Sequence, residues 1–258
     1  MKIKTRVIIL AAGKGTRMNN GFPKALTPVG GTPMIAHLLH AVADAHIDSR
    51  PLIVIGHEAE KVRAALGPHY DYVVQHEQLG TGHAVACARG AVSADTEAIV
   101  VLYADHPTLR SSTITRLVRL HRESAGPLAL MTVTVPDFNE WRAPLYDFGR
   151  IIRNERDAHI TDIVERRDAT PEQLNIREVN PSFFCFRAAW LWDHLPQLKQ
   201  DNTAHEFYLT DLVHIAIQNG QSVASIGISP LESIGINTPA QLALAEQLLE
   251  HGDASDKQ

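Results

Sequence analysis

The sequence predicts a doubly wound α/β fold with a mostly parallel central sheet. Short apolar runs that suit buried strands alternate along the chain with longer segments whose apolar residues recur at helical spacing. Several strand-like runs, such as VIILAA and AIVVLY, are apolar throughout, which is typical of parallel strands covered on both faces. The chain has 258 residues, of which 45% are hydrophobic, and this is enough for one compact catalytic unit.

The first half of the chain carries the clearest alternation of strands and helices. Residues 7–12 predict a buried strand that ends abruptly in a glycine-rich turn, and further strands are expected at 51–56, 71–75, 98–105 and 128–135. Helices are expected between them at 33–47, 57–66, 80–92 and 112–124. Pro33 suits the first turn of its helix, and Ser111 or Ser112 is expected to cap the last one.

The character of the sequence changes at Pro136, where an aromatic and irregular stretch begins. Further elements follow: two short strands within 151–169, a strand running into a helix at 179–192, a helix at 205–220, a strand at 221–229 and a helix at 238–252. We therefore expect a single domain over 1–252, with a nucleotide-binding half at about 1–135, a small substrate-facing β lobe at about 136–237 and a polar tail at 253–258.

Composition excludes several classes of protein. The formal net charge of −5 argues against nucleic acid as a partner, because binding the phosphate backbone requires a concentrated basic face. Cys87 and Cys185 lack the spacing of a zinc site and are expected to be buried, reduced thiols. The apolar run at 7–12 is too short to span a bilayer and lacks a cleavage site, so we expect a cytoplasmic protein without a membrane anchor.

The glycine-rich turn after the first strand is a candidate phosphate-binding loop. It is neither a Walker A motif nor GxGxxG, but its two glycines let backbone N–H groups approach phosphate oxygens. Lys14, Arg17 and Lys24 can neutralise phosphate charge. Asp105 ends another apolar run, and ligands of open α/β sheets bind beyond the carboxyl ends of strands.

Separated motifs then carry a resemblance to a known family. LAAGKGTRM, PKAL, GGTPMIAH, QHEQLGTGHAV, LYADHP, FGRIIRN, HEFYLTD and SIGINTPAQ occur in one order along nearly the whole chain. Together they resemble the sugar-1-phosphate nucleotidyltransferases, above all the uridyltransferase domain of enzymes that also carry an acetyltransferase domain. The resemblance implies a Rossmann-like nucleotide-diphospho-sugar transferase fold. No hexapeptide-repeat segment follows Gln258, so we do not expect the acetyltransferase half.

The same resemblance implies roles for individual residues. Arg17 and Lys24 would act on the reacting phosphates as catalytic cations, and Asp105 with Asn237 would hold Mg²⁺, which prefers oxygen ligands. The nucleotide would contact Leu10, Ala11, Ala12, Gly13, Lys14, Gly15, Thr16, Gln75, Gly80 and Thr81, with Gln75 and the Gly80-Thr81 turn at the uracil base. The sugar would contact Tyr103, Gly149, Glu165 and Asn180.

The implied reaction joins UTP and N-acetylglucosamine 1-phosphate to give UDP-N-acetylglucosamine and pyrophosphate. The sequence departs from the family at Ala104, His106, Pro181, Ser182 and an apparent insertion at 139–147, all bordering the expected sugar pocket. Two alternatives therefore stay open, namely a nucleotidyltransferase for another sugar phosphate or nucleotide, and a non-catalytic regulator that binds sugar nucleotides. A histidine metal site is not expected, and Trp190 and Trp192 are expected to serve packing.

Overall fold

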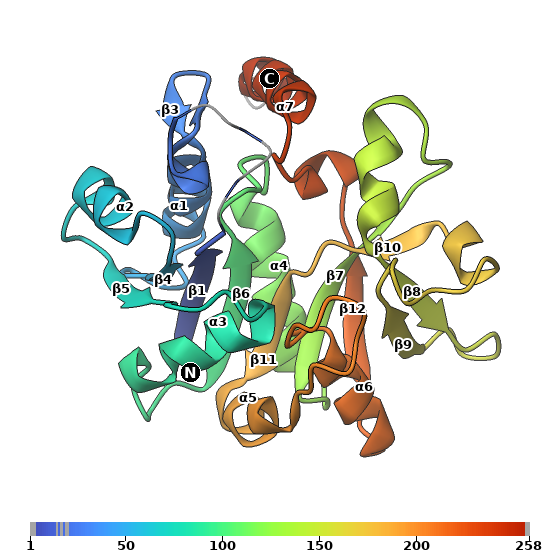
Figure 1. Ribbon diagram of the computed structural model, residues 1–258. Coiled ribbons are helices and arrows are strands. Elements are labelled where there is room, and N and C mark those ends of the chain that lie inside the picture. The colour runs from blue at the N-terminus through green and yellow to red at the C-terminus, as the bar shows by residue number, and fades with distance from the viewer. Residues whose placement is uncertain (1–3, 14, 16–17, 19–20, 256–258) are drawn as a thin grey trace.

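The computed structural model describes residues 4–13, 15, 18 and 21–255, with the backbone alone for 251–255. A ten-stranded sheet runs through the middle of the molecule, and helices lie on both of its faces (Figure 1). Its strands are β1 (Thr5–Ala11), β4 (Leu52–Ile55), β5 (Asp71–Val74), β6 (Ala98–Tyr103), β7 (Leu128–Thr134), β8 (Gly149–Arg153), β9 (Ile160–Val164), β10 (Glu178–Asn180), β11 (Phe184–Arg187) and β12 (Val223–Gly227). A separate small hairpin pairs β2 (Pro28–Val29) with β3 (Thr32–Pro33).

Seven α-helices occur in the described residues: α1 (Met34–Asp44), α2 (Ala59–Leu66), α3 (Thr81–Ala88), α4 (Ser111–Glu123), α5 (Ala188–His194), α6 (Asp211–Gln218) and α7 (Pro239–Ser255). Short 3₁₀ turns join them at η1 (Lys24–Leu26), η2 (Arg89–Ala91), η3 (Glu140–Asp147), η4 (Gln173–Asn175), η5 (Leu195–Gln197) and η6 (Pro230–Ser233).

The order of the strands confirms the predicted doubly wound, mostly parallel sheet. The strands follow one another as β5-β4-β1-β6-β11-β7-β10-β8-β9, with β12 also paired to β7. β5, β4, β1 and β6 run parallel, and β12 runs parallel to β7. β11 is antiparallel to both β6 and β7, so β7 points the same way as β6.

Alternate residues of the central strands fill two separate cores. Ile8 and Leu10 of β1 face the core covered by α3, α5 and α6, whereas Val7 and Ile9 face the core covered by α1, α2 and α4. All of β4 and nearly all of β6 are buried. This double covering explains why these runs are apolar throughout, since neither face of the strand meets water.

A small antiparallel lobe extends the sheet at its far edge. β10 pairs with both β7 and β8, and β8 pairs with β9. The two strands expected within 151–169 are therefore present, with β8 beginning slightly earlier, at Gly149. The inserted segment at 139–147 forms the 3₁₀ turn η3 beside this lobe (Figure 1).

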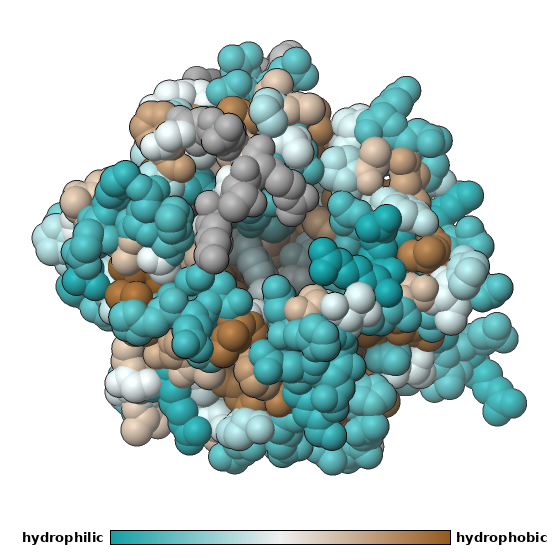
Figure 2. Space-filling view, viewed as in Figure 1, coloured by the Kyte–Doolittle hydropathy of each residue, from teal (hydrophilic) through white to brown (hydrophobic). Residues whose placement is uncertain are grey.

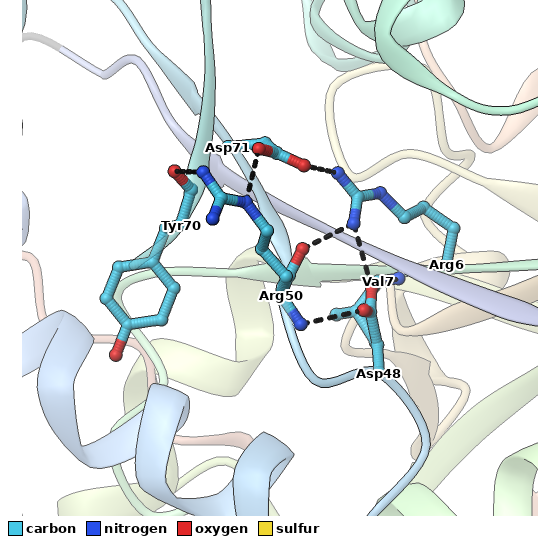
Figure 3. A network of polar contacts seen from close by, with 6 residues as sticks. All are labelled: Arg6, Val7, Asp48, Arg50, Tyr70 and Asp71. Carbon is cyan, nitrogen blue, oxygen red and sulfur yellow. Dashed lines mark hydrogen bonds and ion pairs between the residues drawn. The ribbon is translucent and has the colours of Figure 1, made fainter. Parts of the chain in front are cut away.

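A charged network joins β1, β4 and β5 at their amino ends, away from the site described below (Figure 3). Asp71 accepts hydrogen bonds from Arg6 and, at 2.6 Å, from Arg50 Nε. Burial opposes ionisation of Asp71, but the two guanidinium groups hold its pKa below the ordinary value. Asp48 Oδ2 accepts from Val7 N at 2.8 Å, and Asp48 Oδ1 accepts from Arg50 N at 3.0 Å. The network thereby links the segments at the amino ends of these three parallel strands.

Three details of the expected elements are wrong. The helix expected at 205–220 begins only at Asp211, because the residues before it lie against the loop that precedes α3 and satisfy its backbone groups. Pro33 lies one residue before α1. Neither Ser111 nor Ser112 caps α4, whose N-cap residue is Arg110 with no side-chain cap.

Two expectations about composition can be compared with the described residues. Cys87 and Cys185 are both free; Cys185 is buried and Cys87 is partly buried. In the part of the chain that the structure covers, no helix combines the length and apolar character needed to cross a bilayer.

Candidate functional site

A cavity of about 240 Å³ opens at the carboxyl ends of β1, β5 and β6. Figure 2 shows the hollow near the middle of the face that Figure 1 presents. Its position follows from the parallel sheet, because loops that leave neighbouring parallel strands diverge at this edge. Many residues expected at the site line it: Leu10, Ala11, Ala12, Gly13, Lys24, Gln75, Gly80, Thr81, Tyr103 and Asp105.

Three polar side chains from distant parts of the sequence meet at one end of this cavity. Lys24 Nζ donates to Asp105 Oδ2 at 2.5 Å and to Asn237 Oδ1 at 2.7 Å. The backbone supports the meeting, since Ile236 N donates to the Asp105 carbonyl at 2.9 Å. The side chains of Lys24 and Asp105 are only 18% and 20% exposed, so water screens their charges weakly.

The charge state of Asp105 follows from its neighbours. Burial opposes ionisation, but Lys24 and His106 hold the pKa of Asp105 well below its usual range. His106 Nδ1 lies 2.9 Å from Asp105 Oδ1, and the imidazole ring packs edge-on against Phe183 with centroids 4.9 Å apart. Asp105 is therefore a fixed carboxylate at the end of β6.

The oxygens of Asp105 and Asn237 fit a bound divalent cation. Both already converge on one cationic group, the Lys24 ammonium, and both are the hard donors that Mg²⁺ prefers. Among the described residues, no three His, Cys, Asp or Glu side chains come together as a metal site. Two histidines have other polar neighbours: His37 Nε2 lies 3.0 Å from the Val29 carbonyl, and His83 Nδ1 lies 3.1 Å from Gln75 Nε2.

The other end of the cavity is built around Gln75, which follows β5. Its side-chain amide nitrogen donates to the Gly80 carbonyl at 3.2 Å and also faces His83 Nδ1. A carbonyl can only accept, so the amide nitrogen must face Gly80 and the amide oxygen remains as an acceptor. His83 then accepts on Nδ1, and its other ring nitrogen, Nε2, lies 3.8 Å from the Cys87 sulfur.

The turn beside Gln75 is fastened to the segment before α6. Phe207 N donates to the Leu79 carbonyl and Gly82 N donates to the Phe207 carbonyl, both at 2.8 Å. Gly80 has a φ of +108°, and a Cβ atom there would lie 2.6 Å from the Phe207 carbonyl oxygen. Glycine is therefore required at position 80 both for its backbone conformation and for this close approach.

The residues expected at the sugar come together beside Tyr103. Asn180 of β10 is paired with Gly149 of β8, and a Cβ atom on Gly149 would lie 3.4 Å from Glu165 Oε1. Burial raises the pKa of Glu165, whose Oε1 accepts from the Thr210 hydroxyl at 3.0 Å. Burial likewise raises the pKa of Tyr103.

One of the departures from the family, Ser182, contacts these residues directly. Ser182 N donates to Asn180 Oδ1 at 2.9 Å, and Ser182 has a φ of +65°. The Ser182 side chain also hydrogen-bonds Tyr103. The Asn180 side chain is thereby hydrogen-bonded within its own loop.

Three expected loop residues, Lys14, Thr16 and Arg17, lie outside the described residues. Gly15 is described and packs against Lys24: its φ is +62°, and a Cβ atom there would lie 2.7 Å from Lys24 Cβ. The glycine thus lets the opening loop approach the residue whose ammonium group reaches Asp105.

Sequence reasoning missed several residues of the cavity. Ala25, Gln78, Ala84 and Glu206 also line it, and His83 orients Gln75 from behind. All five lie inside or next to motifs that carried the family resemblance, and that position was the only available signal.

Comparisons with known proteins agree with this architecture. Residues 7–214 match the model of the MobA-like NTP transferase domain. The chain is 38% identical over 244 residues to the bifunctional protein GlmU of Solibacter usitatus, covering 94% of this chain and 51% of that protein. It is 36% identical over 245 residues to the GlmU of Desulfotalea psychrophila, covering 94% of this chain and 70% of that protein. The chain spans about half the length of most of the curated relatives it matches.

Solved structures show the same fold at lower identity. A Bacillus anthracis structure named for glucose-1-phosphate thymidylyltransferase superposes with a TM-score of 0.74 at 22% identity, covering 95% of this chain and 94% of that one. A CMP:2-keto-3-deoxy-manno-octonic acid synthetase complexed with CTP superposes with a TM-score of 0.67 at 17% identity, covering 96% and 99%. The fold is that of the nucleotide-diphospho-sugar transferases, as expected.

Proposed function

The chain belongs to the family of NTP transferases with a MobA-like domain, and from this we propose that it is a sugar-1-phosphate nucleotidyltransferase. The substrates are UTP and N-acetylglucosamine 1-phosphate, and the products are UDP-N-acetylglucosamine and pyrophosphate. The contact of Lys24 with Asp105 and Asn237 at one end of the cavity carries this proposal.

The chemistry needs positioned charge rather than a protein nucleophile. A phosphate oxygen of the sugar phosphate attacks the α-phosphorus of the nucleotide in line, and pyrophosphate leaves. Negative charge grows on the transferred group and on the leaving group during this step. The Lys24 side chain is only 18% exposed, so its ammonium group stabilises that charge with little screening by water.

Magnesium is the proposed cofactor, with Asp105 and Asn237 as its protein ligands. Bound there, it would polarise the phosphate oxygens and neutralise part of their charge. Arg17, which lies outside the described residues, is proposed as a second cation on the reacting phosphates.

The Gln75 amide supports uracil as the base. Its nitrogen is used by Gly80 and His83, which leaves the oxygen to accept a hydrogen bond. Uracil presents an N–H at N3, whereas cytosine has a bare acceptor there. A CTP molecule in the same pose would place two acceptors against each other, so UTP is favoured over CTP.

Tyr103, Gly149, Glu165 and Asn180 support a sugar subsite. They lie together at the edge where the antiparallel lobe meets the central sheet. Acceptors such as the partly buried Glu165 carboxylate suit sugar hydroxyl groups, and the buried Asn180 amide suits a sugar hydroxyl or an N-acetyl group.

One assay tests the proposal: pyrophosphate release from each of five nucleoside triphosphates paired with each of several sugar 1-phosphates, with Mg²⁺ or with EDTA. The expected result is Mg²⁺-dependent turnover that is fastest for UTP with N-acetylglucosamine 1-phosphate. Faster turnover with another pair would replace the proposed substrates by that pair. Absence of turnover for every pair, with UDP-N-acetylglucosamine still bound in calorimetry, would favour a non-catalytic binding protein.

A further inference from the structure

The inserted segment at 139–147 is a folded unit that is anchored at both ends. At its start, Asp137 Oδ1 accepts from Asn139 N at 2.9 Å and from the Arg142 guanidinium at 2.6 Å. Near its end, Leu145 is buried in one of the two main cores. A segment tied down in this way has a defined shape and can transmit position to its neighbours.

Arg150 secures the end of this segment from below. Its side chain is fully buried, and its guanidinium group donates to the backbone carbonyls of Phe148 and, at 3.0 Å, of Tyr146. The rings of Phe138 and Tyr146 lie 5.1 Å and 4.8 Å from the guanidinium carbon. A buried cation needs such partners, so Arg150 holds the carbonyls and rings around it in fixed places.

A second guanidinium group contacts Tyr146. The Arg166 guanidinium carbon lies 5.4 Å from the centroid of the Tyr146 ring, and Arg166 Nη1 lies 3.3 Å from Asp147 Oδ1. Arg166 is 46% exposed, in contrast to Arg150. The Tyr146 ring therefore contacts one buried cation in β8 and one exposed cation just beyond β9.

Arg150 and Arg166 each come directly after a residue proposed for the sugar subsite in the sequence. Arg150 comes after Gly149 in β8, and Arg166 comes after Glu165, just beyond β9. β8 and β9 are paired, with Arg150 opposite Val164. Gly149 and Glu165 already approach each other closely, since a Cβ atom on Gly149 would lie 3.4 Å from Glu165 Oε1. A contact that fixes the position of Arg150 relative to Arg166 therefore also fixes the position of Gly149 relative to Glu165.

We propose that Tyr146 is a positioning residue for the sugar subsite, which it shapes by bridging Arg150 and Arg166. Removing the ring takes one contact from Arg166 and leaves it the Asp147 carboxylate. The position of Glu165 relative to Gly149 is then less closely fixed, while Lys24 and Asp105 at the phosphate end are untouched. The inference rests on the proposed function, because it concerns the sugar subsite of that reaction. The inserted segment is thus a determinant of sugar phosphate binding and takes no part in the chemical step.

The test compares KM values for the two substrates in Tyr146→Ala, Tyr146→Phe and Arg166→Met, using the substrate pair that the unsubstituted protein prefers. In Tyr146→Ala the KM for the sugar phosphate is expected to rise about tenfold, because the variant loses the two cation–π contacts that position the subsite. The KM for the nucleotide and kcat should change little. Tyr146→Phe keeps the ring, so its KM for the sugar phosphate should equal that of the unsubstituted protein. Arg166→Met should raise the KM for the sugar phosphate without disturbing the buried Leu145.

Trp141→Ala is the matched control. Trp141 is another partly exposed aromatic residue of the same segment, but its ring contacts Arg142 rather than Arg150 or Arg166. Its KM values should remain unchanged. An unchanged sugar phosphate KM in both Tyr146→Ala and Arg166→Met, or equal rises in both KM values, would overturn the inference. Absence of turnover in the unsubstituted protein would instead overturn the proposed function, so the two failures are distinct.

Discussion

Replacing Lys24 by methionine should separate the catalytic role of this side chain from its structural one. Methionine keeps most of the side-chain length and removes the ammonium group that contacts Asp105 Oδ2 at 2.5 Å and Asn237 Oδ1 at 2.7 Å. Loss of one fixed charge beside the reacting phosphates should lower kcat by about 10²- to 10³-fold. Pyrophosphate release at saturating substrates measures this loss.

The same substitution should also destabilise the fold, for a different reason. Asp105 is 20% exposed and would be left as a carboxylate without its nearest cation. Breaking a buried ion pair in this way costs about 3 kcal/mol of unfolding free energy. Adding Asp105→Asn removes the stranded charge, so Lys24→Met with Asp105→Asn should regain most of the lost stability.

Chemical denaturation without substrates measures stability. Together with pyrophosphate release, it separates the catalytic role of Lys24 from its structural role. The double variant should be more stable than Lys24→Met and yet remain inactive, because it lacks both the cation and the carboxylate. Two results would refute the reasoning: Lys24→Met with unchanged turnover, or a double variant no more stable than expected from adding the two single effects.

Two further predictions concern pH and shape. Burial, with the nearby charge of Arg187, lowers the pKa of His121 to about 4, so the free energy of unfolding should fall by about 3 kcal/mol as pH drops from above 6.5 to 4. Denaturation of His121→Leu should show a smaller fall over the same pH range, and equal falls in the two proteins would contradict the assignment. Gly80→Ala should raise the nucleotide KM about tenfold or more because its Cβ would collide with the Phe207 carbonyl, whereas Gly90→Ala, with open space, should not; equal KM values would exclude this role for the turn.

Local pattern was sufficient to place the strands and Asp105. The run AIVVLYAD predicts a buried strand with a carboxylate at its end, because a strand that is buried on both faces has a continuous apolar sequence. The meeting of Lys24 with Asn237 could not be derived this way. These residues are 213 positions apart, and only the path of the whole chain from η1 to the loop before α7 brings them together.

Element boundaries were less predictable where tertiary contacts replaced local ones. Residues 205–210 have a helical pattern, yet Phe207 hydrogen-bonds the loop before α3 and the helix starts at Asp211. The start of α4 has serines suited to capping but does not use them. Likewise, nothing in the irregular composition of 139–147 indicated a turn organised around the buried charge of Arg150.

The antiparallel strand β11 has a consequence for how the chain matures during synthesis. β6 and β7 emerge from the ribosome long before residues 184–187, which must later fill the gap between them. Until then, each of those strands has an apolar edge without its neighbour, and such edges invite pairing with other chains. A chain stopped before Phe184 would therefore be prone to aggregation, and closure of the sheet, in which β11 joins β6 to β7, is a late event.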